Sequence, residues 1–490
     1  MANETILMLP LYLIGFFSLA AVGLDPLFSK NKKVIYYLSL IGLLEAAISA
    51  GYALYLHTLT PAPNIEISYA KNMVSTGGMA YFFDILFCLS GILILLSSPR
   101  YFTREYKELS EFYSLILLSV SGMMIMAHSA NLLVLFIGIE IMSLSFYILA
   151  GFIRIRIMSV EAALKYFLLG AFSTGFLVYG IAMIYGATGT LTLSVIQLSI
   201  QTNTINSLYL TIGIGLIIIG LSFKAAIFPF HQWAPDVYHG SPTVIAGFLS
   251  AAGKAAAMMA FIIIARAIFG GLSQNNFVKD LYVDVRLVLA VLSAATMLIG
   301  NITALVQKNI KRMLAYSSVA HAGYLLMGVV AANERGWSGI LFYSTAYILM
   351  QIGAFIVISL SERNDEQNLK ISEYRGFSKA HPYLAAIMSI FMFSLAGLPP
   401  FAGFFGKYYL FTAAVETGYV WLTIVAVISS LISMYFYIGL IIKMYFEDPD
   451  TQPMVAESGH AVLALTLSTA GVMIFGIFPS LLMDIAKIFF

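Results

Sequence analysis

Several charged side chains stand inside long apolar runs of this sequence, where proton transfer is the chemistry that suits them best. Glu140 follows the run Leu-Phe-Ile-Gly-Ile, and lysines occupy comparable settings. A charge at the centre of a membrane helix costs about 2.5–3.5 kcal/mol, so these groups must face one another or internal water. Desolvation lowers the pKa of a lysine and a nearby carboxylate raises it, so moving the carboxylate can release the proton. The lysines in question are Lys165, Lys224, Lys254 and Lys407.

The carboxylates near these lysines predict how the charges pair. We expect Glu140 and Lys224 to form a buried ion pair that breaks and forms again as protons move. Lys165 lies one helical turn beyond Glu161, on the same helix face. Asp84 stands close to the end of its apolar run and is interpreted as an interfacial cap. The alternative is that these groups form ion pairs that only fix helix packing.

Histidines extend the set, because histidine titrates near neutral pH. His321 shares an apolar run with Ser317 and Tyr324, and a relay role there competes with simple packing. His231 and His239 follow a proline-containing break. We expect both at the cytoplasmic surface, where His231 is a candidate for proton entry.

The composition sets the class of protein. The chain has 490 residues, of which 60% are hydrophobic and only 10% charged, and its mean hydropathy is +0.90. Soluble domains carry roughly 25% charged residues, so this chain needs lipid as its solvent. The single cysteine, Cys88, excludes an internal disulfide and a cysteine-ligated iron–sulfur or zinc site. With no glycine-rich phosphate loop either, the chain is predicted to bind no cofactor or metal itself.

Apolar stretches of roughly 20 residues predict an all-α membrane protein with about fourteen spans. Of the 26 Lys and Arg residues, 16 fall in loops after odd-numbered stretches and 5 after even-numbered ones. This bias puts the odd-numbered loops in the cytoplasm and both termini outside. The predicted spans are 6–28, 34–56, 79–98, 112–127, 131–152, 161–186, 208–228, 241–269, 286–305, 313–332, 338–360, 383–414, 419–446 and 459–485.

Two of these spans, the seventh and the twelfth, combine proline, glycine and lysine. Proline breaks a helix, and a broken membrane helix survives only where protein or a polar cavity satisfies its backbone. Paired broken helices are typical of inverted-repeat transporters, although coincidental proline kinks are the alternative. An offset of five helices means opposite topology. The single bundle 1–490 is thus divided into three N-terminal helices within residues 1–110, repeats 111–270 and 285–446, and a C-terminal helix 459–490.

The motifs around these residues resemble the antiporter-like subunits of complex I, and most closely the N-type subunit (subunit 2 in organelles). Lysine rather than glutamate at position 407, and the end of the chain after fourteen helices, favour that type. The resemblance rests on the segments 135–140, 161–170, 223–243, 301–318 with 321–324, and 397–407.

The resemblance implies a proton-translocating subunit of NADH:quinone oxidoreductase in a bacterial plasma membrane. A polar axis would run through Glu140, Lys224, Lys254 and Lys407, with Lys165 as an auxiliary member. NADH, FMN, iron–sulfur clusters and quinone would be bound by partner subunits, among them other antiporter-like subunits. A multi-subunit Na⁺/H⁺ antiporter and a non-transporting scaffold remain the alternatives.

Overall fold

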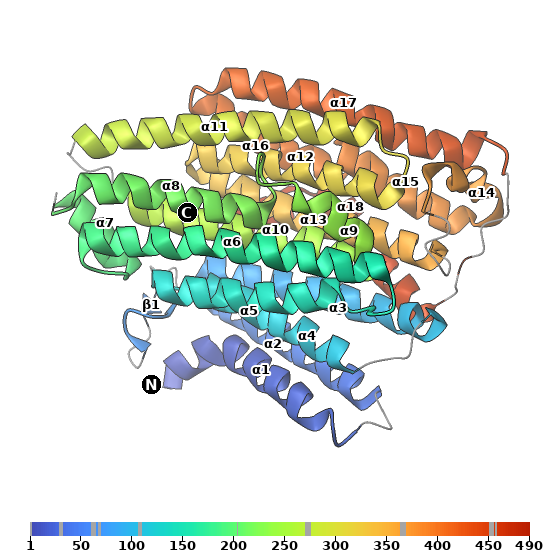
Figure 1. Cartoon of the computed structure of the whole chain (residues 1–490), viewed down its shortest axis with the longest axis horizontal. Helices are drawn as coiled ribbons and strands as arrows, with labels where there is room; N and C mark the ends of the chain where they lie inside the picture. The colour runs from blue at the N-terminus through green and yellow to red at the C-terminus, as the bar shows by residue number, and fades with distance from the viewer. Residues whose placement is uncertain are drawn as a thin grey trace.

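A computed structural model describes most of the chain as one bundle of long helices (Figure 1). The prediction of an all-α membrane protein is confirmed. Two two-residue strands, β1 and β2, form the single small hairpin among the described residues. The described residues are 2–28, 33–59, 65–66, 70–105, 110–202, 204–269, 276–362, 369–449, 455 and 458–490.

The elements run in the following order. They are α1 (Ala2–Leu24), α2 (Lys33–Leu59), β1 (Ile65–Glu66), β2 (Ser75–Thr76), α3 (Gly78–Glu105), α4 (Glu111–Ala127), α5 (Leu132–Ala150), α6 (Ile157–Thr188), α7 (Leu193–Gln201), α8 (Ser207–Ala225) and α9 (Trp233–Gly240). Then follow α10 (Thr243–Phe269), α11 (Asn276–Leu305), α12 (Ile310–Ala331), α13 (Glu334–Ser361), η3 (Ile371–Tyr374), α14 (Phe377–Ala380), α15 (Pro382–Ala396), α16 (Ala402–Glu416), α17 (Val420–Phe446), α18 (Gly459–Ile477) and α19 (Ser480–Lys487).

Within the described residues, 12 helices are long and apolar enough to cross a membrane, and α4 and α15 are shorter apolar helices. The predicted span 383–414 is two half-helices, α15 and α16, separated by residues 397–401. The predicted span 208–228 ends early, at Ala225, and residues 226–232 form the second break. Both helices predicted to be broken are therefore broken, while the count of fourteen spans stays a prediction.

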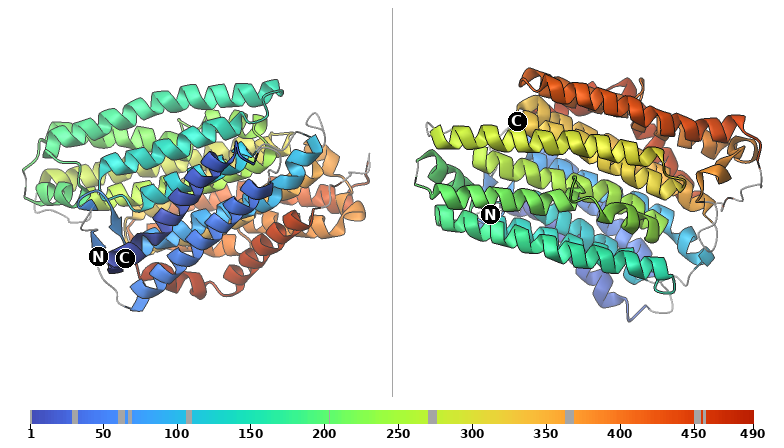
Figure 2. Two further views of the ribbon diagram at one scale, coloured as in Figure 1. Left: turned by 90° about the horizontal axis from the view of Figure 1, so that it is seen from below. Right: turned by 45° about the horizontal axis from the view of Figure 1, so that its top comes forward.

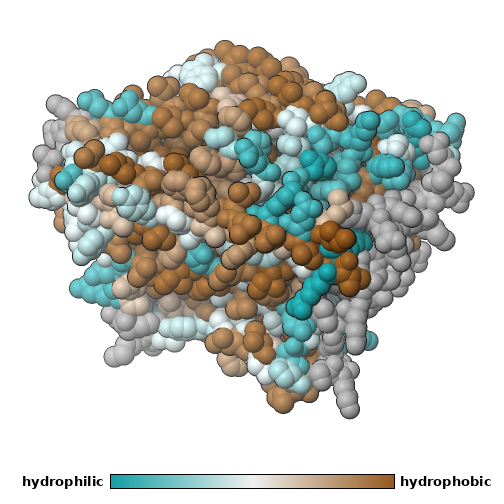
Figure 3. All heavy atoms as spheres, viewed as in Figure 1, coloured by the Kyte–Doolittle hydropathy of each residue, from teal (hydrophilic) through white to brown (hydrophobic). Residues whose placement is uncertain are grey.

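The helices form layers around a protein-filled centre. The central helices are α10 and α13, whose spans are 94% and 100% buried, whereas α1 and α17 lie at opposite edges (Figures 1 and 2). Large apolar side chains such as Leu19 and Phe172 are about seven-tenths exposed on the outer helices. Figure 3 shows hydrophobic side chains over much of one face, with hydrophilic ones toward both sides and in a band right of its centre. This is the surface that a lipid belt requires.

Asparagine starts four of the long helices. Its side-chain oxygen accepts a backbone N–H of the first turn, which satisfies a donor that the helix cannot. The Asn131 oxygen lies 2.9 Å from the Leu133 nitrogen, and the Asn309 oxygen lies 2.9 Å from the Lys311 nitrogen. Asn206 and Asn333 cap α8 and α13 in the same way.

Two of these asparagines begin helices at opposite ends of the bundle and share a further feature. Asn131, before α5, forms an isolated antiparallel bridge with Thr192, and Asn309, before α12, forms one with Lys370. In both cases the partner lies 61 residues further along the chain. The starts of α5 and α12 are thus held by the same kind of contact.

Both ends of the chain lie at one end of the bundle. Near the N-terminus, the Leu7 carbonyl accepts a hydrogen bond from the Tyr81 hydroxyl at 3.1 Å. Near the C-terminus, the Phe489 ring lies 6.0 Å from the Phe82 ring and 6.4 Å from the His57 ring. Since Tyr81 and Phe82 stand at the start of α3, both termini lie at the same end of the bundle, and α9 lies at the opposite end.

Candidate functional site

Lys224 and Glu140 lie together inside the bundle, as the sequence predicts. Lys224 stands in the last turn of α8, immediately before the break, and its side chain is only 3% exposed. Its ammonium nitrogen lies 3.9 Å from a carboxylate oxygen of Glu140 on α5. The same oxygen accepts a hydrogen bond from the Thr174 hydroxyl of α6 at 2.9 Å. The lysine therefore has a charged partner close by but not in direct hydrogen-bond contact.

Two neutral groups on α5 hold the Lys224 ammonium instead. It donates to the Ser143 hydroxyl at 2.8 Å and to the Tyr147 hydroxyl at 3.2 Å. These residues follow Glu140 at spacings that keep them on one helix face. Tyr147 needs space on the neighbouring helix α6, because a Cβ at Gly170 would lie 2.1 Å from the Tyr147 hydroxyl oxygen. The glycine thus makes room for a hydroxyl that binds the lysine.

Lys254 occupies the middle of α10 and is 1% exposed. Its ammonium donates to the backbone carbonyl and the hydroxyl of Ser318 on α12. No carboxylate lies within ion-pair distance of Lys254 in the described part of the chain. Dipoles rather than an opposite charge therefore satisfy this lysine.

His321 lies one turn after Ser318 and is enclosed by tyrosines. Its Nδ1 is hydrogen-bonded to the Tyr343 hydroxyl, and its Nε2 lies 3.1 Å from the Tyr437 hydroxyl. The Tyr437 hydroxyl is in turn bonded to the Ser317 hydroxyl. Since each of these groups can both donate and accept a proton, they form a continuous hydrogen-bonded path beside Lys254.

Lys407 lies in α16 but binds the end of α15. Its ammonium donates to the carbonyls of Leu395 and Ala396 at 3.0 Å each, and to the Ser430 hydroxyl at 2.9 Å. It also lies 4.8 Å from the centre of the Tyr324 ring. The turn between the half-helices passes through Gly397 at φ +85°, where a Cβ would also lie 2.9 Å from the lysine side chain. Lys407 therefore caps the negative end of a half-helix.

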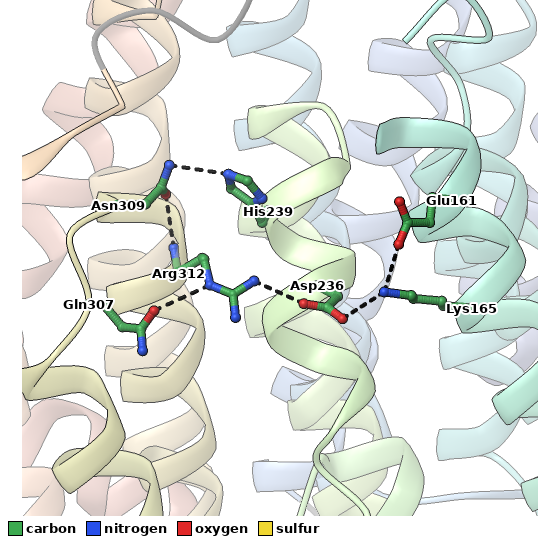
Figure 4. A network of polar contacts seen from close by, with 7 residues as sticks. All are labelled: Glu161, Lys165, Asp236, His239, Gln307, Asn309 and Arg312. Carbon is green, nitrogen blue, oxygen red and sulfur yellow. Dashed lines mark hydrogen bonds and ion pairs between the residues drawn. The ribbon is translucent and has the colours of Figure 1, made fainter. Parts of the chain in front are cut away.

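Lys165 lies apart from this buried group. Its ammonium lies 2.7 Å from Glu161, as the spacing predicts, and also 2.9 Å from Asp236 of α9, a partner that the sequence did not suggest (Figure 4). The Lys165 side chain is 43% exposed. It thus belongs to a polar network at the α9 end of the bundle rather than to its centre.

His231 and His239 are half-buried at the α9 end of the bundle, and their position at the cytoplasmic surface stays a prediction. The His231 ring lies 5.5 Å from the Phe228 ring at an interplanar angle of 40° and is within electrostatic reach of Lys254. His239 accepts a hydrogen bond from the Asn309 amide at 3.2 Å. Burial, together with the nearby positive charges of Lys311 and Arg312, lowers the pKa of His239 to about 4. His239 is therefore neutral at pH 7.

The expectation that Asp84 is an interfacial cap is wrong. Asp84 is fully buried in α3, and its carboxylate lies 2.8 Å from the ring of His128, which follows α4. The other ring nitrogen of His128 binds the Ser75 carbonyl at 3.1 Å. This second buried acid–base pair had no sequence signal beyond an aspartate and a histidine in two apolar runs. Nowhere in the described residues do three His, Cys, Asp or Glu side chains gather to hold a metal ion.

Comparison with known proteins places this geometry in a family. The sequence profile of the family described as "NADH:quinone oxidoreductase/Mrp antiporter, TM" matches residues 129–433, which is more than half of the chain. This chain belongs to that family. The matched segment contains both broken helices and the four predicted axis residues Glu140, Lys224, Lys254 and Lys407.

Relatives and solved structures agree with the assignment. The NADH-quinone oxidoreductase subunit N of Trichlorobacter lovleyi is 44% identical over 461 residues, covering 94% of this chain and 91% of that protein. A chain of respiratory complex I from Thermus thermophilus with bound aureothin is 32% identical with a TM-score of 0.81, covering 97% of this chain and 98% of that one. A chain of the Mrp complex from Dietzia has a TM-score of 0.85 at 21% identity, covering 100% and 97%. The last likeness shows the fold alone.

Proposed function

We propose that this chain is the antiporter-like, proton-translocating N-type subunit of an NADH:quinone oxidoreductase. The observation that supports it most directly is the pair formed by the buried Lys224 and the partly exposed Glu140, 3.9 Å apart, at the first of two broken helices that each carry a buried lysine. Partner subunits would bind NADH, FMN, the iron–sulfur clusters and quinone, and would carry out the electron transfer. This chain would contribute the proton path, with other antiporter-like subunits beside it.

The attraction between Glu140 and Lys224 is comparable with the work of moving one proton across the membrane. Two unit charges 3.9 Å apart attract by about 4 kcal/mol at an effective dielectric constant of ~20. Moving one proton against about 200 mV requires about 4.6 kcal/mol. A change in the Glu140–Lys224 separation therefore shifts the proton affinity of Lys224 by an amount comparable with the work of translocation. Protons would pass between Lys224, Lys254 and Lys407, with His321 and its tyrosines as the relay between the last two.

The two repeats, 111–270 and 285–446, belong to the same proposal. The bridges Asn131–Thr192 and Asn309–Lys370 support it, because they recur at the same spacing and at opposite ends of the bundle. By the excess of Lys and Arg in the odd-numbered loops, the α9 end would face the cytoplasm of a bacterium and both termini would face outward. His231 would then lie on the inward side of Lys254 and serve proton entry.

The test is NADH-driven proton pumping in inverted membranes carrying Lys224→Ala. We expect pumping or turnover to fall at least about tenfold, which corresponds to ~1.4 kcal/mol, because the buried proton carrier is gone. Assembly of the complex is checked on a native gel. Lys487→Ala is the matched control, because that lysine is 60% exposed at the termini end of the bundle.

Three outcomes are decisive. Normal turnover with an undiminished proton-to-electron ratio in Lys224→Ala would contradict the proton path and leave the scaffold alternative. Migration of this chain apart from any NADH dehydrogenase activity, with Na⁺-dependent proton exchange, would indicate a multi-subunit Na⁺/H⁺ antiporter. Loss of pumping in a fully assembled complex supports the proposal.

A further inference from the structure

Asp236 joins three helices at the α9 end of the bundle. It lies in the first turn of α9, the short helix between the break after α8 and the start of α10. One carboxylate oxygen lies 2.9 Å from the Lys165 ammonium of α6, and the other lies 2.9 Å from the Arg312 guanidinium of α12. Figure 4 shows the carboxylate between the two cations. We call these three residues the Asp236 clasp.

The helices that meet at the clasp are those that contact the proposed proton carriers. Nine residues beyond Lys165, about 14 Å along α6, Thr174 donates its hydroxyl to Glu140. Six residues beyond Arg312, about 9 Å along α12, Ser318 accepts from Lys254. The clasp therefore fixes the helix that binds Glu140 relative to the helix that binds Lys254.

Neutral contacts hold α9 in place independently of these charges. A Cβ at Gly240 would lie 2.4 Å from the Met158 carbonyl oxygen, so the end of α9 touches the backbone of α6. His239 binds Asn309, the residue that caps α12. Removal of the Asp236 charge should therefore release the clasp without undocking α9.

The exposure of the clasp decides its strength. The side chains of Asp236, Lys165 and Arg312 are 39%, 43% and 31% exposed. Exposed ion pairs contribute only about 0.2–1 kcal/mol each and weaken in salt, whereas a fully buried pair would be nearly permanent. Burial alone would raise the pKa of the Asp236 carboxyl, but the hydrogen bonds from Lys165 and Arg312 hold it below its usual value. The clasp is thus charged at neutral pH and weak enough to open reversibly.

We propose that Asp236 is a positioning residue that couples the Glu140–Lys224 pair to Lys254 through α6 and α12. The inference rests on the proposed function and deepens it. With the clasp closed, the Thr174–Glu140 and Lys254–Ser318 contacts change together. With Asp236 neutral, the two sets of contacts move independently, so that protons are lost from the cycle while electron transfer continues.

The experiment is Asp236→Asn in the intact complex, with NADH:quinone turnover and proton-to-electron ratio measured in inverted membranes. We expect a two- to fivefold fall in the ratio, the range that ion pairs of about 0.4–1 kcal/mol produce, with turnover retained. High salt should lower the ratio of the native protein toward that of the variant and should leave the variant unchanged. Asp236→Glu should restore the ratio, which a purely structural defect would not allow.

Glu416→Gln removes a comparably exposed ion pair, Arg335–Glu416, at the opposite end of the bundle, and should leave the ratio unchanged. If Asp236→Asn does not assemble, Arg312→Gln opens the same clasp from its other side and takes its place. An unchanged ratio at every salt concentration, with Lys224→Ala still inactive, would overturn the clasp and leave the proposed function intact. A native complex that pumps no protons would overturn the proposed function itself.

Discussion

The two broken helices each stabilise a buried lysine, but they do so with different partners. Lys224 lies before its break, in the last turn of α8, whereas Lys407 lies after its break, in α16, and reaches back to α15. Each ammonium is therefore near the negative end of a half-helix, where a cation is stabilised. They differ in their nearest partners, since Lys224 has the carboxylate of Glu140 and Lys407 has two backbone carbonyls and Ser430.

The same difference appears along α5 and α12. Counted from the capping asparagines, Glu140 and Ser318 both lie nine residues into their helices. The first half thus places a charge at the depth where the second half places a hydroxyl. A charge can be neutralised or moved, whereas a backbone carbonyl keeps its dipole, so the first half is the adjustable one and the second half the fixed one.

Glu140→Gln should have the largest effect on this contrast. It removes the only charge acting on Lys224 within ion-pair distance among the described residues. We expect proton pumping to fall at least about tenfold, since the lost attraction is about 4 kcal/mol before further screening by water. Pumping in inverted membranes measures it, with assembly checked on a native gel. A variant that pumps normally would show that the first half is as fixed as the second.

Ser430→Ala should have a smaller effect in the second half. Lys407 keeps the Leu395 and Ala396 carbonyls and loses only its 2.9 Å hydrogen bond to the Ser430 hydroxyl, which also donates to Ala396 at 3.2 Å. A net loss of about 0.5–1.5 kcal/mol predicts a two- to tenfold fall in pumping rate. The same assay measures it beside Glu140→Gln. Equal losses in the two variants would contradict the assignment of a fixed second half.

The smallest effect concerns α9, between the two halves, and depends on pH. The pKa of His239 is lowered to about 4, so an unfolded α9 binds a proton more readily than the docked one. Docking therefore weakens as the pH falls through about 6.5, by roughly 1 kcal/mol at pH 5.5 after allowance for solvent screening. Hydrogen exchange of residues 233–240, corrected for its intrinsic pH dependence, should show about fivefold less protection at pH 5.5 than at pH 7.5. His239→Gln keeps an acceptor for Asn309 and should abolish most of that change.

Local signals made much of this structure predictable. Apolar length gives the spans, proline gives the breaks, and the cost of a buried charge indicates that Glu140 and Lys224 must face the interior. These signals lie within single helices. They predicted the pair at the first break and the buried positions of Lys254 and Lys407.

Contacts between helices were less predictable. Asp236 and Arg312 are 76 residues apart, and Asp84 and His128 are 44 apart, so their pairing depends on how helices are rotated and shifted against each other. Neutral hydrogen-bond partners are harder still to predict. Every residue has a backbone carbonyl, so the residue types do not indicate that the carbonyl of Ser318 binds a lysine. The partner of His239 was unpredictable for the same reason, since Asn309 lies 70 residues further along the chain.

The central position of α10 has a consequence for how the protein is made. In the finished bundle this helix is 94% buried and its lysine binds α12, yet α10 is synthesised before α12 and α13. For that interval Lys254 has no partner on α12, and the apolar residues of α10, a helix with a mean hydropathy of 1.9, must outweigh a penalty of about 2.5–3.5 kcal/mol. A chain interrupted after α10 would leave Lys254 without its Ser318 partner. The residue proposed to carry protons in the mature subunit would thus be an unsatisfied charge in the unfinished one.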